Sequence, residues 1–299
     1  MASTAQVGNG ARVPCEVCSG EQFRTLFEKE EHTFMRCSAC GLERIDPPPS
    51  DETLAAIYGD HYYDAWGLRS DEQTVARLKK ATFADLLDQL PPAKPGARLM
   101  DCGAATGFLL EVARERGYEP YAVEFGDLGA KELARKFGAD RVFQGEIEGA
   151  RFADAADGDF QVITMCDYIE HVRDPAKVLK RASAMLAPGG CLAITTPDAG
   201  SLSHAALRSG WTHYKLEHLH YFDRKNLASL LGRCGFSDVK FHPLAKSLSI
   251  GYIRQMFEVY PHPLLSRAAA VLGRVVPDRL QSRRLRLPTG EMFAVARKA

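Results

Sequence analysis

The chain has 299 residues, of which 45% are hydrophobic and 25% charged, and it carries 38 basic and 38 acidic side chains. Because these charges cancel, the protein as a whole has no net positive charge that would attract nucleic acid or an anionic membrane. The length allows one sizeable domain with small attachments, or two domains. No apolar run is long enough to span a bilayer, and the first ten residues lack the pattern of a secretory signal, so we expect a cytoplasmic protein.

Four of the eight cysteines form two Cys-x-x-Cys pairs near the N-terminus, and the other four stand singly in apolar segments, where they read as small core residues. Two such pairs can close a tetrahedral thiolate shell around zinc and leave no position for a substrate. A glycine follows each pair closely, which eases the tight turn that the ligands require. The sequence therefore predicts a structural zinc ribbon over residues 1–48, with the ligands Cys15, Cys18, Cys37 and Cys40.

The proline cluster "DPPPSD" at 46–51 ends the ribbon, and residues 49–92 are expected to form linker and lid helices. Apolar residues recur with helical spacing most clearly over residues 74–90. An aromatic cluster in the same segment contains Tyr62, Tyr63 and Trp66. We expect one of the two tyrosines to cap a bound cofactor.

From residue 93 onward, short apolar runs alternate with amphipathic helical segments, a pattern typical of a mostly parallel sheet covered on both faces. We therefore expect an α/β fold over residues 93–299, with a doubly wound, Rossmann-like sheet of seven strands. Residues 244–288 interrupt the last hairpin as a basic, partly helical insertion. We expect the apolar face of that insertion to pack on the domain.

The turn after the first strand of this region reads "DCGAATGF" at residues 101–108. Gly103 allows a sharp turn, and Gly107 allows the following helix to approach the strand closely. Ala105 stands where a dinucleotide fingerprint has its second glycine, which argues against NAD. Glu124 ends the second strand, where a carboxylate can accept two hydrogen bonds from ribose hydroxyls.

Together with "DFQVITMCDYIEHVRDP" (159–175) and "LAPGGCLAITTPD" (186–198), this turn resembles the class I S-adenosylmethionine-dependent methyltransferases. The resemblance covers roughly residues 90–243 and the final strand. It implies that these residues bind S-adenosylmethionine: Asp101 and Gly103 beside the methionine moiety, Ala105 and Gly107 in the same turn, Glu124 on the ribose, Glu146 near the adenine amine, and Asp167 beside the methionine portion.

Two histidine-bearing segments are expected to face the transferred methyl group. "IEHV" places His171 just beyond the fourth strand, and "EHLHYF" at 217–222 follows the fifth strand. A histidine near its ordinary pKa can remove the proton of an attacking hydroxyl. We therefore expect His171, His218 and Glu217 to line the acceptor pocket, and His220 to be structural.

A second resemblance concerns "CDYIEHVRDP", which is similar to the corresponding stretch of ubiquinone-pathway O-methyltransferases. In those enzymes acids and the histidine can hold a divalent ion, which here would involve Asp167, Glu170 and His171. A hard ion usually needs more oxygen ligands than this set offers.

The ribbon, the "IEH" segment and the "W…EHL.YF" segment together resemble a bacterial group linked to methylation of sugars, polysaccharides or secondary metabolites. O-methylation of a saccharide or natural-product hydroxyl is therefore the leading hypothesis. Three alternatives stay open: sugar C-methylation, whose enzymes carry an additional C-terminal domain; RNA methylation; and a non-catalytic role in which the ribbon recruits a partner. RNA is disfavoured because residues 1–50 carry five basic and seven acidic side chains.

Overall fold

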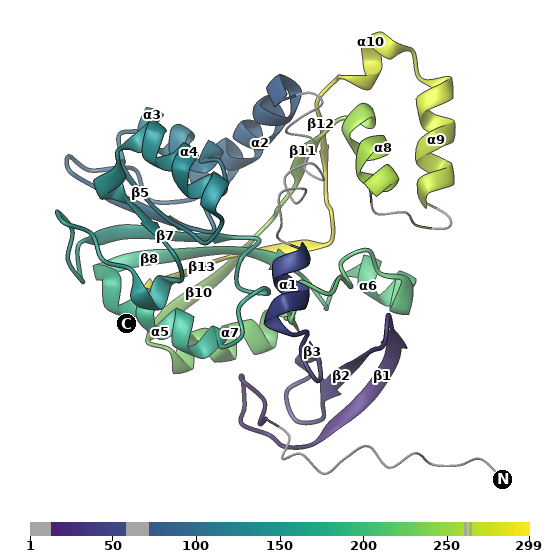
Figure 1. Ribbon diagram of the computed structural model, residues 1–299, viewed down its shortest axis with the longest axis horizontal. Coiled ribbons are helices and arrows are strands. Elements are labelled where there is room, and N and C mark those ends of the chain that lie inside the picture. The colour runs from purple at the N-terminus through teal and green to yellow at the C-terminus, as the bar shows by residue number, and fades with distance from the viewer. Residues whose placement is uncertain (1–12, 58–71, 260–261, 263–264) are drawn as a thin grey trace.

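The computed structural model describes residues 13–57, 72–259, 262 and 265–299 (Figure 1). The aromatic cluster around Tyr62, Tyr63 and Trp66 lies outside the described residues. The strands are β1 (Phe23–Lys29), β2 (His32–Cys37), β3 (Glu43–Ile45), β4 (Arg98–Cys102), β5 (Glu119–Glu124), β6 (Val142–Gln144), β7 (Phe160–Cys166), β8 (Leu186–Pro197), β9 (His220–Tyr221), β10 (Phe236–His242), β11 (Lys246–Leu248), β12 (Leu285–Leu287) and β13 (Glu291–Lys298). The α-helices are α1 (Asp51–Ile57), α2 (Glu72–Leu87), α3 (Phe108–Glu115), α4 (Asp127–Phe137), α5 (Pro175–Met185), α6 (Leu202–Leu207), α7 (Arg224–Arg233), α8 (Ile250–Val259), α9 (Leu265–Val275) and α10 (Asp278–Gln281).

The central sheet has seven strands in the order β10-β13-β8-β7-β4-β5-β6. The five strands from β8 to β6 run parallel, whereas β13 is antiparallel to both β8 and β10. Helices α3 and α4 cover one face of this sheet, and α5 and α7 cover the other (Figure 1). The predicted seven-stranded, mostly parallel α/β sheet is confirmed.

Both faces of the sheet are buried because neighbouring residues of each strand serve opposite cores. On β4, Leu99 packs in the cluster that includes α2, α3 and α4, and Met100 packs in the cluster that includes α5 and α7. On β5, Ala122 packs in the first of these clusters and Val123 in the second. The continuous apolar runs of the sequence follow from this double burial.

Two helices of the second layer begin where short side chains bind free backbone N–H groups. Asp174 accepts a hydrogen bond from the Lys177 backbone N–H at 2.9 Å, and Pro175 follows it at the first position of α5. Asp223 and Asn226 form a reciprocal capping box at the start of α7. These caps fix the point at which the chain turns back after each preceding strand.

The N-terminal strands form a second sheet in the order β1-β2-β3-β9, and its last strand belongs to the "EHLHYF" segment. Glu43 pairs with Tyr221 and Arg44 with His220, while the Ile45 N–H donates to the Leu219 carbonyl at 3.2 Å. The ribbon therefore shares a sheet with the segment that was expected to line the acceptor pocket.

The insertion consists of the β11-β12 pair and the helices α8, α9 and α10, which project from the sheet domain (Figure 1). Helix α9 packs on α8 through Ala269, which is buried, and Gly273, where an added Cβ would lie 2.3 Å from the Arg254 side chain. The apolar side chains Val271 and Val275 remain exposed. The expectation that the apolar face packs on the domain is therefore wrong for this part of α9, because α8 contacts the side of the helix that carries Ala269 and Gly273.

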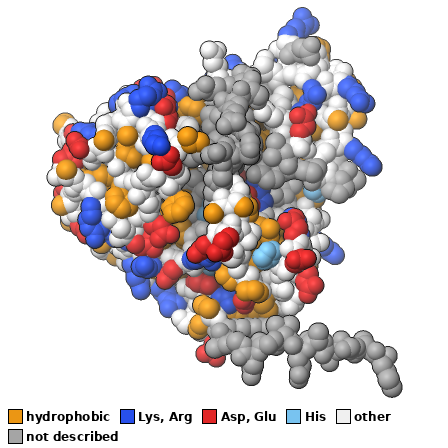
Figure 2. Space-filling view, in the orientation of Figure 1, with side chains coloured by type: hydrophobic (Ala, Val, Ile, Leu, Met, Phe, Trp, Pro, Cys, Tyr) orange, Lys and Arg blue, Asp and Glu red, His pale blue; other side chains and the backbone are white. Residues whose placement is uncertain are grey.

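Acidic and basic side chains are interspersed over the face of the sheet domain that Figure 2 draws. This mixture agrees with the equal numbers of basic and acidic residues in the chain. Within the described ranges, no helix has the length and apolarity needed to cross a membrane.

Replacing Gly107 by alanine should lower the free energy of unfolding by about 2–4 kcal/mol. Gly107 has a φ of 86°, and an added Cβ would lie 2.8 Å from both Leu133 and Phe137. The control is Gly232→Ala in α7, where no atom lies within 4 Å of an added Cβ. That change should alter stability by about 1 kcal/mol or less, in the stabilising direction. Urea unfolding of the two variants measures the difference, and equal stabilities would contradict the constraint at Gly107.

Candidate active site

The turn between β4 and α3 is held in a narrow, left-handed conformation. Gly103, Ala105 and Gly107 have φ values of 71°, 48° and 86°. An added Cβ at Gly103 would lie 2.8 Å from the Tyr168 ring, so only glycine fits there. The Gly103 N–H donates to the Val123 carbonyl at 2.8 Å, which ties the turn to the end of β5. The backbone is thus shaped to pass close to a ligand beyond the strand ends.

Glu124 binds this turn from the neighbouring strand. Its Oε2 accepts a hydrogen bond from the Ala105 N–H at 2.7 Å, and its Oε1 accepts one from the Gly126 N–H at 2.8 Å. Burial raises the pKa of Glu124, and these backbone hydrogen bonds act in the opposite direction. A carboxylate has about four lone-pair sites, so two remain for hydroxyl groups of a ligand.

Asp101 lies at the end of β4 and is 4% exposed. Its Oδ1 accepts a hydrogen bond from the Thr164 hydroxyl at 2.6 Å. Burial raises the pKa of Asp101 to about 7, although this hydrogen bond favours the ionised form. Asp101 therefore supports the turn from within the sheet, next to Glu124.

Two apolar side chains beside Glu124 were not singled out from the sequence. Phe125, directly after Glu124, is 68% exposed, and Leu128 at the start of α4 is 51% exposed. Nearby, the Gly145 N–H donates to the Glu124 carbonyl at 3.0 Å and brings the loop with Glu146 to the same edge. The Glu146 side chain is exposed. The available signal for Phe125 was its position directly after the acid that ends β5, at the edge of the sheet where ligands bind.

Asp167 follows β7 and forms an ion network with the insertion. Lys246 on β11 contacts Asp167 Oδ2 at 2.8 Å and Glu291 at 2.7 Å. Burial alone raises the pKa of Asp167, but the ammonium groups of Lys246 and Lys79 outweigh it and hold the pKa below its usual range. Burial likewise lowers the pKa of Lys246, and the two carboxylates reverse the shift. Asp167 therefore stays ionised, and its lysine partner could not be predicted from the sequence.

The structure brings His171 and His218 together. Their ring centroids lie 4.7 Å apart and the ring planes are perpendicular. His218 Nδ1 lies 2.9 Å from the His213 carbonyl, which makes Nδ1 the donor and leaves the lone pair on Nε2. Burial lowers the pKa of His218 well below 6.5, and that of His171 to about 4. Both rings are therefore neutral near pH 7, but each is a weaker base than the histidine of ordinary pKa that was expected from the sequence.

Glu217 contributes to this pair through its backbone. The Glu217 carbonyl accepts a hydrogen bond from the His171 ring, and the buried carboxylate lies 3.9 Å from Lys215 Nζ. This arrangement orients the His171 ring. A catalytic role for the Glu217 carboxylate stays a prediction.

Glu170 lies against the same two rings and is fully buried. Its Oε2 accepts a hydrogen bond from Thr196, whereas Oε1 has no hydrogen-bond partner among the described residues. Burial raises the pKa of Glu170 well above 4.5, and the neighbouring Asp167 adds to the shift. One ligand atom each from Glu170, His171 and His218 lie within 4.8 Å of one another. The group that could hold a metal thus includes His218 in place of Asp167.

His220 faces away from this pair, toward the ribbon. Its Nε2 lies 3.5 Å from Glu16 Oε1, and Glu16 also binds Arg44 at 2.9 Å. Glu16 stands between the cysteines of the first pair. The structural role that was expected for His220 is therefore a contact between the acceptor segment and the ribbon.

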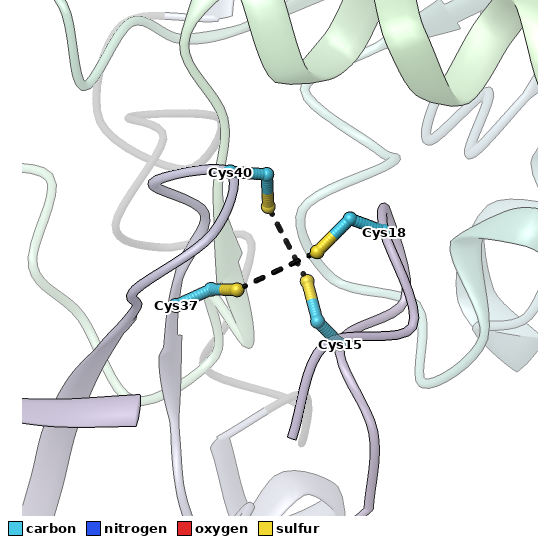
Figure 3. A group of neighbouring side chains, drawn as sticks. All are labelled: Cys15, Cys18, Cys37 and Cys40. Atoms are coloured by element: carbon cyan, nitrogen blue, oxygen red, sulfur yellow. Dashed lines mark hydrogen bonds between the residues drawn. The ribbon is translucent and has the colours of Figure 1, made fainter. Parts of the chain in front are cut away.

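The four ribbon cysteines point toward one another from two turns (Figure 3). The Sγ atoms of Cys15 and Cys40 lie 3.4 Å apart, and those of Cys18 and Cys37 lie 3.6 Å apart. All four lie within 4.8 Å of one another. Four thiolates bound to zinc at about 2.3 Å would be separated by about 3.8 Å in a tetrahedron. The spacing and the donor set therefore fit a small structural zinc site.

The methyltransferase domain family matches residues 75–240, which is more than half of the chain. A ubiquinone biosynthesis O-methyltransferase of Methylococcus capsulatus is 25% identical over 142 residues, covering 46% of this chain and 59% of the relative. A malonyl-[acyl-carrier protein] O-methyltransferase of Enterobacter lignolyticus is 30% identical over 173 residues, covering 55% of this chain and 61% of the relative. The chain thus matches less than two thirds of the length of these relatives.

Solved structures show the same fold at lower identity. A SAM-dependent methyltransferase of Thermotoga maritima superposes with a TM-score of 0.51 at 19% identity and covers 80% of this chain and 99% of its own. A SAM-dependent methyltransferase of Archaeoglobus fulgidus gives a TM-score of 0.50 at 20% identity and covers 75% of this chain and 94% of its own. With its glycine turn and strand order, the chain has the same fold as these proteins, and it belongs to the methyltransferase domain family.

Proposed function

We propose that this methyltransferase methylates a hydroxyl oxygen of a small polar acceptor, a saccharide or a natural product, and uses a histidine as general base. S-adenosylmethionine, when bound, supplies the methyl group on a sulfonium centre. The observation that carries the proposal is the perpendicular pair of neutral imidazoles, His171 and His218, beyond the ends of β7 and β8. The two curated relatives described above are named as O-methyltransferases, which supports oxygen as the acceptor atom.

The candidate cofactor residues would contact different parts of S-adenosylmethionine. Glu124 has lone pairs left for the ribose, and the exposed Phe125 offers an apolar face for the base. Asp101 and Gly103 would lie beside the methionine portion, together with Asp167, whose negative charge favours a sulfonium nearby. Glu146 would reach the adenine amine from the loop beside Glu124.

The acceptor residues would hold and deprotonate the hydroxyl. The Nε2 lone pair of His218 is free to accept the proton because Nδ1 is bound to the His213 carbonyl. His171 is oriented by the Glu217 carbonyl, and its ring centroid lies 4.7 Å from that of His218. An imidazole of this pair would take up the hydroxyl proton of the acceptor, and the Asp167 carboxylate would favour the protonated ring at His171.

A second candidate mechanism uses a divalent metal at Glu170, His171 and His218. The grouping of their ligand atoms within 4.8 Å and the unpartnered Glu170 Oε1 favour it. Two imidazoles and one carboxylate suit a transition metal better than magnesium. Such a metal would lower the pKa of a bound acceptor hydroxyl, whereas the leading proposal needs no metal at this position.

Glu124→Ala should weaken binding of S-adenosylmethionine at least tenfold, because loss of a hydrogen bond to a charged group costs about 1.5–3 kcal/mol. Isothermal titration calorimetry measures the affinity. Glu132→Ala on α4 is the matched control, since among the described residues that carboxylate pairs with side chains of its own helix, Arg135 and Lys136. Equal affinities of the two variants would remove Glu124 from the ribose site.

His171→Ala and His218→Ala should each lower kcat by about 10²–10⁴-fold and leave the affinity for S-adenosylmethionine unchanged. The assay follows transfer of a labelled methyl group to a panel of saccharides and phenolic natural products, with the O-methyl product identified by mass spectrometry and NMR. His32→Ala, in β2 of the ribbon, is the control. Full turnover in both variants, with a known acceptor, would contradict the base assignment.

The purified protein should contain one zinc per chain, as expected for four thiolates in a closed shell. Cys37→Ser should lose that zinc and lower the melting temperature, because Cys37 also packs in the core shared with α7. Cys234→Ala, a buried cysteine outside the cluster, should keep it. If the unchanged protein contains a second metal ion that the His218→Ala variant lacks, the metal mechanism is supported. An unchanged protein without zinc would contradict the ribbon assignment.

A further inference from the structure

The insertion concentrates exposed apolar side chains on one part of the surface. Among the described residues, nine large hydrophobic side chains are exposed, and five of these lie within residues 265–288. They are Val271 (56% exposed), Leu272 (51%), Val275 (74%), Leu280 (42%) and Leu287 (37%). Single exposed apolar residues are ordinary, but a group of this kind indicates a contact surface.

The same segment is strongly basic. Residues 265–288 contain six arginines and one aspartate, although the whole chain has a formal net charge of zero. Arg284 and Arg286 pair with Asp85 on α2. The other four, Arg267, Arg274, Arg279 and Arg283, are exposed, and no acidic side chain of the described ranges lies within ion-pair distance of them. Their charge is therefore available to a partner.

The geometry of α9 places both features on one face. Ala269 and Gly273 take the side that packs on α8. Because successive helical residues are rotated by about 100°, the opposite side presents Val271 and Val275 next to Arg267 and Arg274. The helices project away from the sheet, and Figure 2 shows basic side chains along their outer edge.

We propose that the insertion, residues 265–288 on their α8 support, is a docking surface for an anionic lipid bilayer. A helix that presents valine and leucine between arginines lies naturally at the boundary between headgroups and acyl chains. The four arginines that have no ion-pair partner among the described residues attract the negative headgroups over a distance of about one Debye length. The helix is peripheral to the bilayer and does not cross it.

The shape and charge of the surface disfavour two other occupants. A second copy of the chain would set two arginine-rich faces against each other, and like charges oppose such a contact. A peptide helix would dock in a groove between neighbouring elements, whereas α9 is the outermost helix of the insertion (Figure 1). A flat anionic surface satisfies both the charge and the shape.

Co-sedimentation of the full chain with vesicles tests this proposal. Vesicles of phosphatidylcholine mixed with phosphatidylglycerol should bind the protein at least about tenfold more strongly than vesicles of phosphatidylcholine alone, and added salt should weaken that binding. The double change Arg267→Glu and Arg274→Glu should abolish the preference for anionic vesicles. The double change Val271→Ser and Val275→Ser should lower binding at least about tenfold even at low salt.

The controls carry matched changes elsewhere on the surface. Leu202→Ser on α6 removes a side chain that is 90% exposed, and Arg135→Glu inverts an exposed charge on α4. Both should bind vesicles like the unchanged protein, and circular dichroism should show that all variants are folded. Equal binding to both kinds of vesicle, or an equal loss in the controls, would overturn the proposal. Light scattering that shows a dimer dependent on Val271 and Val275 would assign the surface to a second copy instead.

Discussion

The backbone carbonyl of Glu170 joins the two segments on which the candidate acceptor site is built. It accepts hydrogen bonds from the Leu219 N–H at 2.8 Å and the His220 N–H at 3.2 Å. The Leu219 carbonyl in turn accepts one from Ile45 at 3.2 Å, which extends the connection to the ribbon. His171 and His218 each lie one residue from these contacts, so the separation of their rings depends on them. Buried backbone groups are rarely left unpaired, and this makes the connection costly to open.

The residues around these histidines are held in different protonation states by their surroundings. Asp167 is kept ionised by Lys246, whereas burial in the absence of a cation favours the neutral form of Glu170 only three residues later. Environments that push the pKa values of neighbouring groups apart are typical of sites that transfer protons. The insertion supplies the lysine, so a segment outside the methyltransferase sheet takes part in setting the charge of the pocket.

The sheet and the cofactor turn could be predicted because their signals are local. Doubly buried strands read as apolar runs, and the conformations of Gly103 and Gly107 require glycine. The β9 strand could not be predicted, since His220 and Tyr221 are too few to show a period and their partner is distant in sequence. Lys246 gave no signal for the same reason: its carboxylate partners come from β7 and β13, and only the folded chain brings them together.

The pairing of β3 with β9 also bears on how the protein is made. β3 leaves the ribosome early, but the strand that completes its sheet follows roughly 180 residues later, and closing so long a loop is entropically costly and slow. The cysteine turns are local and can form as soon as they emerge, whereas the ribbon acquires its final edge only after all five parallel strands have been synthesised. A ribbon with an unpaired strand is thus a natural species during synthesis, and until β9 arrives its open edge is where a chaperone, or another nascent chain, would attach.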